Sequence, residues 1–162
     1  MRTLKNEIKF SGVGLHSGIK SEVALIPSSA AGIAFKTKNG CYKSSEAVVE
    51  EDSRLTGFRL PDGTAVRTAE HLLASIVGMG LDAVTVQLDG EEVPILDGSA
   101  YPFASAIEET GFLEFGAEMI RPSVFAPVVV DDVASGRIAC ALPSATLKVT
   151  YVIDYSGTPV GT

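Results

Sequence analysis

The chain has 162 residues, of which 46% are hydrophobic and 20% are charged, and its formal net charge is −7. This length and apolar content predict one globular domain, or one domain and part of another, and argue against disorder. The acidic balance argues against nucleic-acid binding, which needs clustered Lys and Arg, and no stretch approaches the roughly 18 apolar residues of a membrane helix.

The cellular compartment is indicated by the N-terminus and the two cysteines. Residues 1–7 contain no continuous apolar run after their basic residues, which argues against a secretory signal. Cys41 and Cys140 lie far apart and form no CxxC pair, so we interpret both as ordinary residues without a disulfide. We therefore expect a reduced, cytoplasmic protein.

The first third of the chain is typical of short β-strands separated by glycine-containing turns. The expected strands are Thr3–Phe10, Glu22–Ile26, Gly32–Thr37, Leu55–Leu60 and Thr64–Arg67. The last two are separated by the sequence Pro61-Asp62-Gly63, and this turn predicts that they form a hairpin.

Two helices and a strand are predicted next. The expected elements are a helix over Thr68–Met79, a strand over Asp82–Leu88, an extended segment over Glu92–Leu96 and a helix over Pro102–Thr110. Thr68 is the expected N-cap of the first helix, and Gly111 is the expected C-terminal stop of the second.

The character of the sequence changes at Glu118–Pro122. Beyond it, three more strands are predicted over Val124–Val130, Arg137–Leu142 and Leu147–Asp154. We therefore predict an α+β domain over residues 1–118, built from a sheet packed with two helices. Residues 119–162 are predicted to be the incomplete start of a second domain.

Only two histidines occur in the chain, and one of them follows a glutamate in the first turn of a predicted helix. A pair such as Glu70 and His71 can combine a metal ligand with a general base that acts on water. The same dipeptide also fits a structural role, in which His71 begins the helix and Glu70 faces the positive end of the helix dipole.

The other candidate residues, His16 and Asp97, lie in turn-like segments. The glycines around His16 allow a tight turn or a close approach to a ligand, and they also fit a bulged β-turn with a surface histidine. Asp97 fits a turn and helix cap, or a carboxylate that supports a site. A catalytic zinc site normally uses about three protein ligands, and the chain contains no HxxxD, HExxH or CxxC, so it shows at most part of a metal site.

Four motifs taken together resemble the UDP-3-O-acyl-N-acetylglucosamine deacetylases, which are zinc-dependent enzymes of lipid A biosynthesis. The motifs are GVGLHSG at 12–18, TAEHL at 68–72, GMGLD at 78–82 and VPILDGSAYPF at 93–103. They occur in the family's order and approximate spacing. The resemblance implies two similar α+β domains of the ribosomal-protein-S5-like kind, with the active site between them, and residues after 124 resemble the start of the second domain.

The resemblance also implies roles for the candidate residues. His71 matches a zinc ligand, Glu70 matches the general base, and His16 and Asp97 match residues near the site. The implied reaction is hydrolysis of the acetamide of a UDP-linked, acylated glucosamine. The family's other zinc ligands, in an HxxxD helix, and its catalytic lysine and histidine belong to a second half for which this chain has no counterpart.

Three interpretations of this half-length chain remain open at this point: an N-terminal fragment, one chain of a split enzyme with a complementary C-terminal chain, or an inactive paralogue. The abrupt end after Tyr155 favours the first two. We expect this chain to be the N-terminal half of such a deacetylase and to be inactive alone. The alternative is a catalytically inactive binding or regulatory domain that keeps the fold. An apolar face left without its second domain would favour a homo-oligomer.

Overall fold

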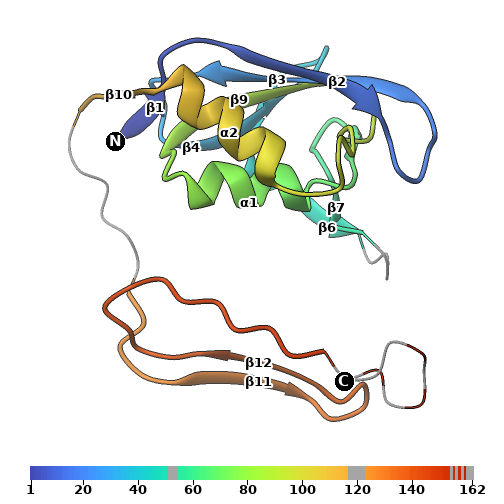
Figure 1. Ribbon diagram of the computed structural model, residues 1–162, viewed down its shortest axis with the longest axis vertical. Coiled ribbons are helices and arrows are strands. Elements are labelled where there is room, and N and C mark those ends of the chain that lie inside the picture. The colour runs from blue at the N-terminus through green and yellow to red at the C-terminus, as the bar shows by residue number, and fades with distance from the viewer. Residues whose placement is uncertain (51–54, 117–122, 154, 156, 158, 160–162) are drawn as a thin grey trace. The chain divides into compact units, whose positions relative to one another are not determined.

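The computed structural model describes residues 1–50, 55–116, 123–153, 155, 157 and 159. The chain divides into two compact units, Met1–Met119 and Ile120–Thr162. The described residues of the first unit form an α+β fold with two α-helices and several small sheets (Figure 1), in agreement with the predicted class. Neither α-helix of the described residues has the length and apolar character that crossing a membrane requires.

The largest sheet of the first unit has five strands. They are, in spatial order, β2 (Ile8–Val13), β3 (Lys20–Pro27), β9 (Ala83–Asp89), β4 (Gly32–Lys36) and β5 (Cys41–Lys43). β4 and β9 are parallel, and the other neighbours are antiparallel. Residues of β3 alternate between exposed and buried, so only one face of the sheet points into the core. The strands predicted over Glu22–Ile26, Gly32–Thr37 and Asp82–Leu88 are confirmed, because they correspond to β3, β4 and β9.

The single strand predicted over Thr3–Phe10 is wrong, because two strands occupy this region. β1 (Arg2–Leu4) pairs antiparallel with β10 (Phe112–Glu114), whereas β2 pairs with β3. The N–H of Lys5 donates to the carbonyl of Gly111, and the chain then leaves the first pairing and enters the second. Three consecutive polar residues, Lys5-Asn6-Glu7, separate the two strands and interrupt the alternation that the single-strand prediction assumed.

Helices α1 (Glu70–Gly78) and α2 (Tyr101–Thr110) cover one face of the five-stranded sheet (Figure 1). The largest fully buried side chains come from the two helices, from the five-stranded sheet and from three positions outside them (Leu4, Val66 and Val93). Those of the helices and the sheet are Val23, Leu25, Phe35, Leu72, Ile76, Val84, Val86, Phe103 and Ile107. Phe10 of β2 meets Phe103 of α2 edge to face, with ring centroids 4.8 Å apart. Gly111, at φ 76°, follows α2 as its C-cap residue, as predicted.

A three-stranded sheet of β6 (Val48–Glu50), β7 (Gly57–Arg59) and β8 (Ala65–Val66) lies beside the core, with the 3₁₀ helix η1 (Ser44–Glu46) before it. The predicted hairpin is confirmed, because β7 and β8 are antiparallel. In its turn, Asp62 accepts the N–H of Thr64 and the hydroxyl of Thr37. Phe58 packs edge to face on Phe35, which attaches this small sheet to the large one.

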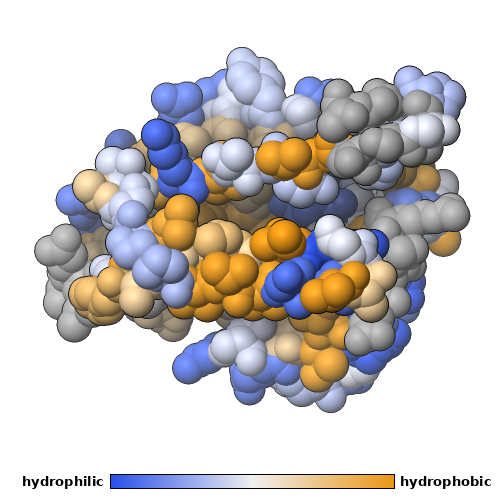
Figure 2. Space-filling model, turned by 90° about the horizontal axis from the view of Figure 1, so that it is seen from below, coloured by the Kyte–Doolittle hydropathy of each residue, from blue (hydrophilic) through white to orange (hydrophobic). Residues whose placement is uncertain are grey.

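The second unit contains an antiparallel hairpin of β11 (Val128–Asp132) and β12 (Arg137–Ala141). The third strand predicted over Leu147–Asp154 is wrong as far as residue 153, and Asp154 lies outside the described residues. Phe125 is 91% exposed and Leu147 is 83% exposed. Figure 2 shows that hydrophobic side chains, coloured orange, reach the surface on the face it displays. Among the described residues of this unit no helix or further strand packs on the hairpin, so burial within the unit does not stabilise a third strand.

Candidate functional site

Glu70 and His71 are the first two residues of α1, and both are partly buried. The N–H of Ala69 donates to the carbonyl of Thr56 at 3.2 Å, and the N–H of Thr56 donates to Oε2 of Glu70 at 3.3 Å. The start of the helix is therefore attached to the segment that leads into β7, and one oxygen of the Glu70 carboxylate takes part in this attachment.

The helix holds His71 in place through its buried side. Leu72 and Ile76 are fully buried, and they fix the rotation of α1 about its axis. The hydroxyl of Ser75 lies 2.7 Å from the carbonyl oxygen of His71 and 2.9 Å from that of Ala100. Since Ala100 directly precedes α2, this hydroxyl connects the backbone at His71 to the start of the second helix.

The expected N-cap role of Thr68 is wrong. The residue before α1 is Ala69, in a helical conformation and without a side-chain cap bond, and Thr68 has a left-handed φ of 53°. Its hydroxyl instead donates to Oε1 of Glu92 at 2.8 Å. The hydrogen bond from this hydroxyl to the ionised carboxylate of Glu92 is charge-assisted. It is therefore stronger than the bond that the same hydroxyl would accept from a helix N–H as an N-cap.

His16 lies in the turn between β2 and β3, and its side chain is exposed. The turn is closed by hydrogen bonds from the N–H of Gly14 to the carbonyl of Ile19 and from the N–H of Gly18 to the carbonyl of Gly14. A Cβ on Gly14 would collide with the carboxylate of Glu92 and with Oγ of Ser17, so this position requires glycine. The backbone of this motif therefore forms a tight turn, and His16 lies on its surface.

Glu92 is the residue of this region that sequence reasoning missed. It is buried, with 4% of its surface exposed. Its carboxylate accepts the N–H of His16 at 2.9 Å, the N–H of Ser17 at 2.8 Å and the hydroxyl of Thr68. The adjacent Glu91 is exposed and pairs with Arg67 at 3.0 Å, so nothing in the pair of glutamates indicates which one is buried.

The hydrogen bonds to Glu92 determine its ionisation. Burial acts to raise the pKa of the carboxyl, but the hydrogen bonds from His16, Ser17 and Thr68 outweigh burial and lower that pKa to about 2. Glu92 is therefore a carboxylate at neutral pH. Its negative charge lies inside the fold, where the three surrounding residues donate to it.

Asp97 lies in the turn four residues before α2 begins, and it is exposed. It accepts both the N–H and the hydroxyl of Ser99, each at 2.9 Å, and Oγ of Ser99 in turn accepts the N–H of Tyr101 at 3.1 Å. These contacts are those of the predicted turn and helix start. A role in catalysis stays a prediction for this residue.

Three of the four sequence motifs meet at the end of the first unit where α1 begins. The N–H of Ile95 donates to the carbonyl of Val13, and the N–H of Val93 donates to the carbonyl of Arg67, both at 3.0 Å. The motif at 78–82 lies at the other end of α1, where Asp82 accepts the N–H of Arg2. The structure thus joins the backbones around His16, Glu70 and Asp97, and gives 78–82 a role in anchoring β1.

The described residues do not by themselves complete a metal centre. Among them, no three or more His, Cys, Asp or Glu side chains are grouped so that they would hold a metal ion. A catalytic zinc needs about three protein ligands, and the resemblance assigns only His71 to the metal.

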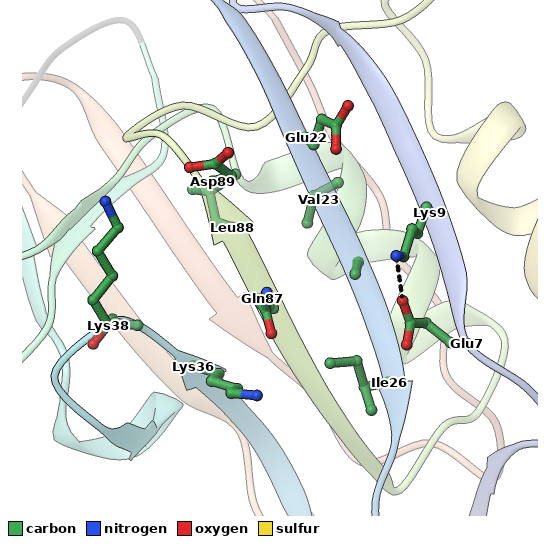
Figure 3. A pocket seen from close by; sticks show the side chains of 12 residues that line it. Glu7, Lys9, Glu22, Val23, Ile26, Lys36, Lys38, Gln87, Leu88 and Asp89 are labelled. Atoms are coloured by element: carbon green, nitrogen blue, oxygen red, sulfur yellow. Dashed lines mark ion pairs between the residues drawn. The ribbon is translucent and has the colours of Figure 1, made fainter.

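A separate cavity of about 720 Å³ lies on the sheet face opposite the buried residues of β3. Figure 3 shows the charged side chains around it, with an ion pair between Lys9 and Glu7 at 3.1 Å. Lys36 and Asp89 also line it, so the lining carries both signs of charge. None of the four predicted site residues lines this cavity.

Comparisons with known proteins agree with the motifs. The family model of UDP-3-O-acyl N-acetylglycosamine deacetylase matches residues 1–162. Proteins named UDP-3-O-acyl-N-acetylglucosamine deacetylase are similar to this chain in Saccharophagus degradans (37% identity), Chromohalobacter salexigens (38%) and Thermosynechococcus vestitus (34%).

The alignments cover 95% of this chain and 52% of the relative's length in the first two cases, and 99% and 57% in the third. The chain thus spans about half the length of the curated relatives it matches. Because the family model matches the chain over its full length, the chain belongs to the UDP-3-O-acyl N-acetylglycosamine deacetylase family.

Proposed function

We propose that this chain is the N-terminal half of a zinc-dependent deacetylase that hydrolyses the acetamide of a UDP-3-O-acyl-N-acetylglucosamine in lipid A biosynthesis. The observation that carries the proposal is the first turn of α1, where a partly buried glutamate and histidine are adjacent and are fixed to the core. The names of the relatives supply the substrate.

In this proposal Glu70 is the general base and then the general acid. Its carboxylate takes a proton from water as the water oxygen bonds to the acetamide carbon. The C–N bond then breaks, Glu70 returns a proton to the departing nitrogen, and the products are acetate and the free amine. One oxygen of Glu70 is held by the N–H of Thr56, which orients the group.

His71 would supply one imidazole ligand to the zinc ion. When bound in a complete site, zinc supplies polarisation of the carbonyl and a water of lowered pKa. The remaining ligands would come from the other half of the deacetylase, supplied on the same chain or on a complementary chain. The 162-residue chain alone would then hold zinc weakly and have no useful activity.

The proposal includes an architecture and a location. The first unit would have the ribosomal-protein-S5-like fold, residues 119–162 would begin a second similar domain, and the active site would lie between the two domains. A cytoplasmic location fits Cys41 and Cys140, which are both free and exposed.

The test is an assay of acetate release from UDP-3-O-acyl-N-acetylglucosamine by the chain combined with the missing half of the deacetylase. We expect Glu70→Ala to lower turnover roughly 10²–10⁴-fold while bound zinc is retained. The matched control is Glu108→Ala, which removes an exposed glutamate of α2 and should leave turnover unchanged. Full turnover by Glu70→Ala would exclude this mechanism, and no turnover by the combined wild-type halves would favour the binding-domain alternative.

A further inference from the structure

The carboxylate of Glu92 connects two parts of the chain that are about fifty residues apart. Oε1 accepts the N–H of His16 at 2.9 Å and the hydroxyl of Thr68 at 2.8 Å, and Oε2 accepts the N–H of Ser17 at 2.8 Å. Thr68 stands two residues before Glu70 at the start of α1. A single buried side chain therefore holds the turn of one motif and the approach to the helix of another.

The backbone around Glu92 extends the same connection. On one side, the N–H of Arg67 donates to the carbonyl of Glu91 at 2.9 Å, and the N–H of Val93 donates to the carbonyl of Arg67 at 3.0 Å. On the other side, the N–H of Ile95 donates to the carbonyl of Val13. The segment 91–95 thus lies between the turn and the entry to α1.

Two features of the neighbouring residues indicate that the carboxylate is required at this place. Gly14 leaves the space that the carboxylate occupies, since a Cβ there would collide with it. Thr68 adopts a left-handed φ of 53°, which is unfavourable for a β-branched residue, and in this conformation its hydroxyl bonds to Glu92. The local strain persists because the surrounding contacts fix it.

We propose that Glu92 is a positioning residue that keeps the turn of His16 and the start of α1 in one fixed relative placement. This inference rests on the proposed function only in taking His16, Glu70 and His71 as parts of the deacetylase site. A carboxylate is needed because all three of its neighbours donate. A glutamine would turn an NH₂ group toward at least one of those donors.

The first test is amide hydrogen exchange, followed by NMR on the 162-residue chain. In Glu92→Gln we expect the amides of His16 and Ser17 to exchange about tenfold faster or more, relative to amides of β3 and β9. The matched control, Glu91→Gln, removes the exposed neighbouring carboxylate and should leave both amides unchanged. Equal exchange in Glu92→Gln and the wild type would overturn the proposal.

A second pair of variants serves if Glu92→Gln does not fold. Thr68→Val removes only the hydroxyl on the α1 side, and Thr68→Ser keeps it. We expect Thr68→Val to speed exchange at His16 and Ser17 several-fold and Thr68→Ser to match the wild type. Wild-type exchange in Thr68→Val, or equally fast exchange in both variants, would show that Glu92 does not couple the two segments.

The last test separates this inference from the proposed function. In the chain combined with the missing half, Glu92→Gln should lower kcat about tenfold or more and leave KM within about twofold, and Thr68→Ser should restore the kcat that Thr68→Val loses. Unchanged kcat in Glu92→Gln would overturn the positioning role. Full activity in Glu70→Ala would overturn the proposed mechanism instead, while the exchange measurements would still decide whether Glu92 couples the two segments.

Discussion

The two units of the chain use apolar residues in opposite ways. In the unit Met1–Met119, Phe103 and Ile107 of α2 are fully buried against the five-stranded sheet. In the unit Ile120–Thr162, a regular hairpin forms, yet Val129 in its first strand is 60% exposed. Backbone pairing therefore occurs in both units, and among the described residues only the first unit has a second layer that covers an apolar face. The difference shows that pairing alone does not produce a core.

The largest expected difference between the units is their sensitivity to protease. Cleavage within residues 123–153 requires little opening, because their side chains are exposed, whereas cleavage within Thr68–Leu88 requires exposure of the buried core. We expect the first cuts in 123–153 to precede cuts in Thr68–Leu88 by at least about a hundredfold in rate. Limited proteolysis followed by mass spectrometry measures this. Early cleavage inside Thr68–Leu88 would contradict the contrast between the units.

The second expected difference is in the free energy of unfolding after truncation of an apolar side chain. Phe103→Ala removes a fully buried ring that also contacts Phe10, and we expect a loss of about 3–5 kcal/mol. Val129→Ala, in the exposed hairpin, should change stability by less than about 0.5 kcal/mol. Urea denaturation followed by circular dichroism compares them. Similar losses in the two variants would mean that the hairpin has a packed face of its own.

A smaller effect is expected from two glycines within the first unit. Gly14→Ala places a methyl group against the carboxylate of Glu92, and displacing that bonded group should cost about 1–3 kcal/mol. Gly78→Ala meets no atom within 4 Å at the end of α1, so stability should be unchanged or raised by up to about 1 kcal/mol. Thermal unfolding of both variants tests this, and an equally stable Gly14→Ala would show that Glu92 can lie elsewhere.

The last expected effect, which appears only at acidic pH, is the dependence of stability on pH that Glu92 contributes. Its pKa falls from an ordinary value of 4.5 to about 2 in the folded chain, so its contribution is complete above about 4.5 and is lost as pH falls toward 2. Hydrogen bonds from Thr37 and Thr64 lower the pKa of Asp62 to about 2 as well, so both carboxylates act in the same window.

The difference in unfolding free energy between the wild type and Glu92→Gln isolates the contribution of Glu92. We expect this difference to be largest at pH 7 and to shrink between pH 4.5 and pH 3. Denaturation curves at these values measure it, with Glu91→Gln as the control whose difference from the wild type stays small. A difference for Glu92→Gln that is constant from pH 7 to pH 3 would contradict the ionised, hydrogen-bonded state of Glu92.

The sequence by itself determined the features that depend on neighbouring residues. The two helices, the turn at Pro61-Asp62-Gly63 and the stop at Gly111 follow from spacing and from backbone preferences that act over a few residues. The motifs around His16, His71 and Asp97 were sufficient to indicate the family, which the family model matches over residues 1–162.

Only the tertiary structure decided where distant segments meet. Two features depend on a partner far along the chain: the pairing of β1 with β10 and the hydrogen bond from Thr68 to Glu92. A third, the missing strand over 147–153, depends on the absence of a covering layer among the described residues. Glu91 and Glu92 are identical in type and adjacent. One is exposed and the other is buried because only the fold places three donors around Glu92.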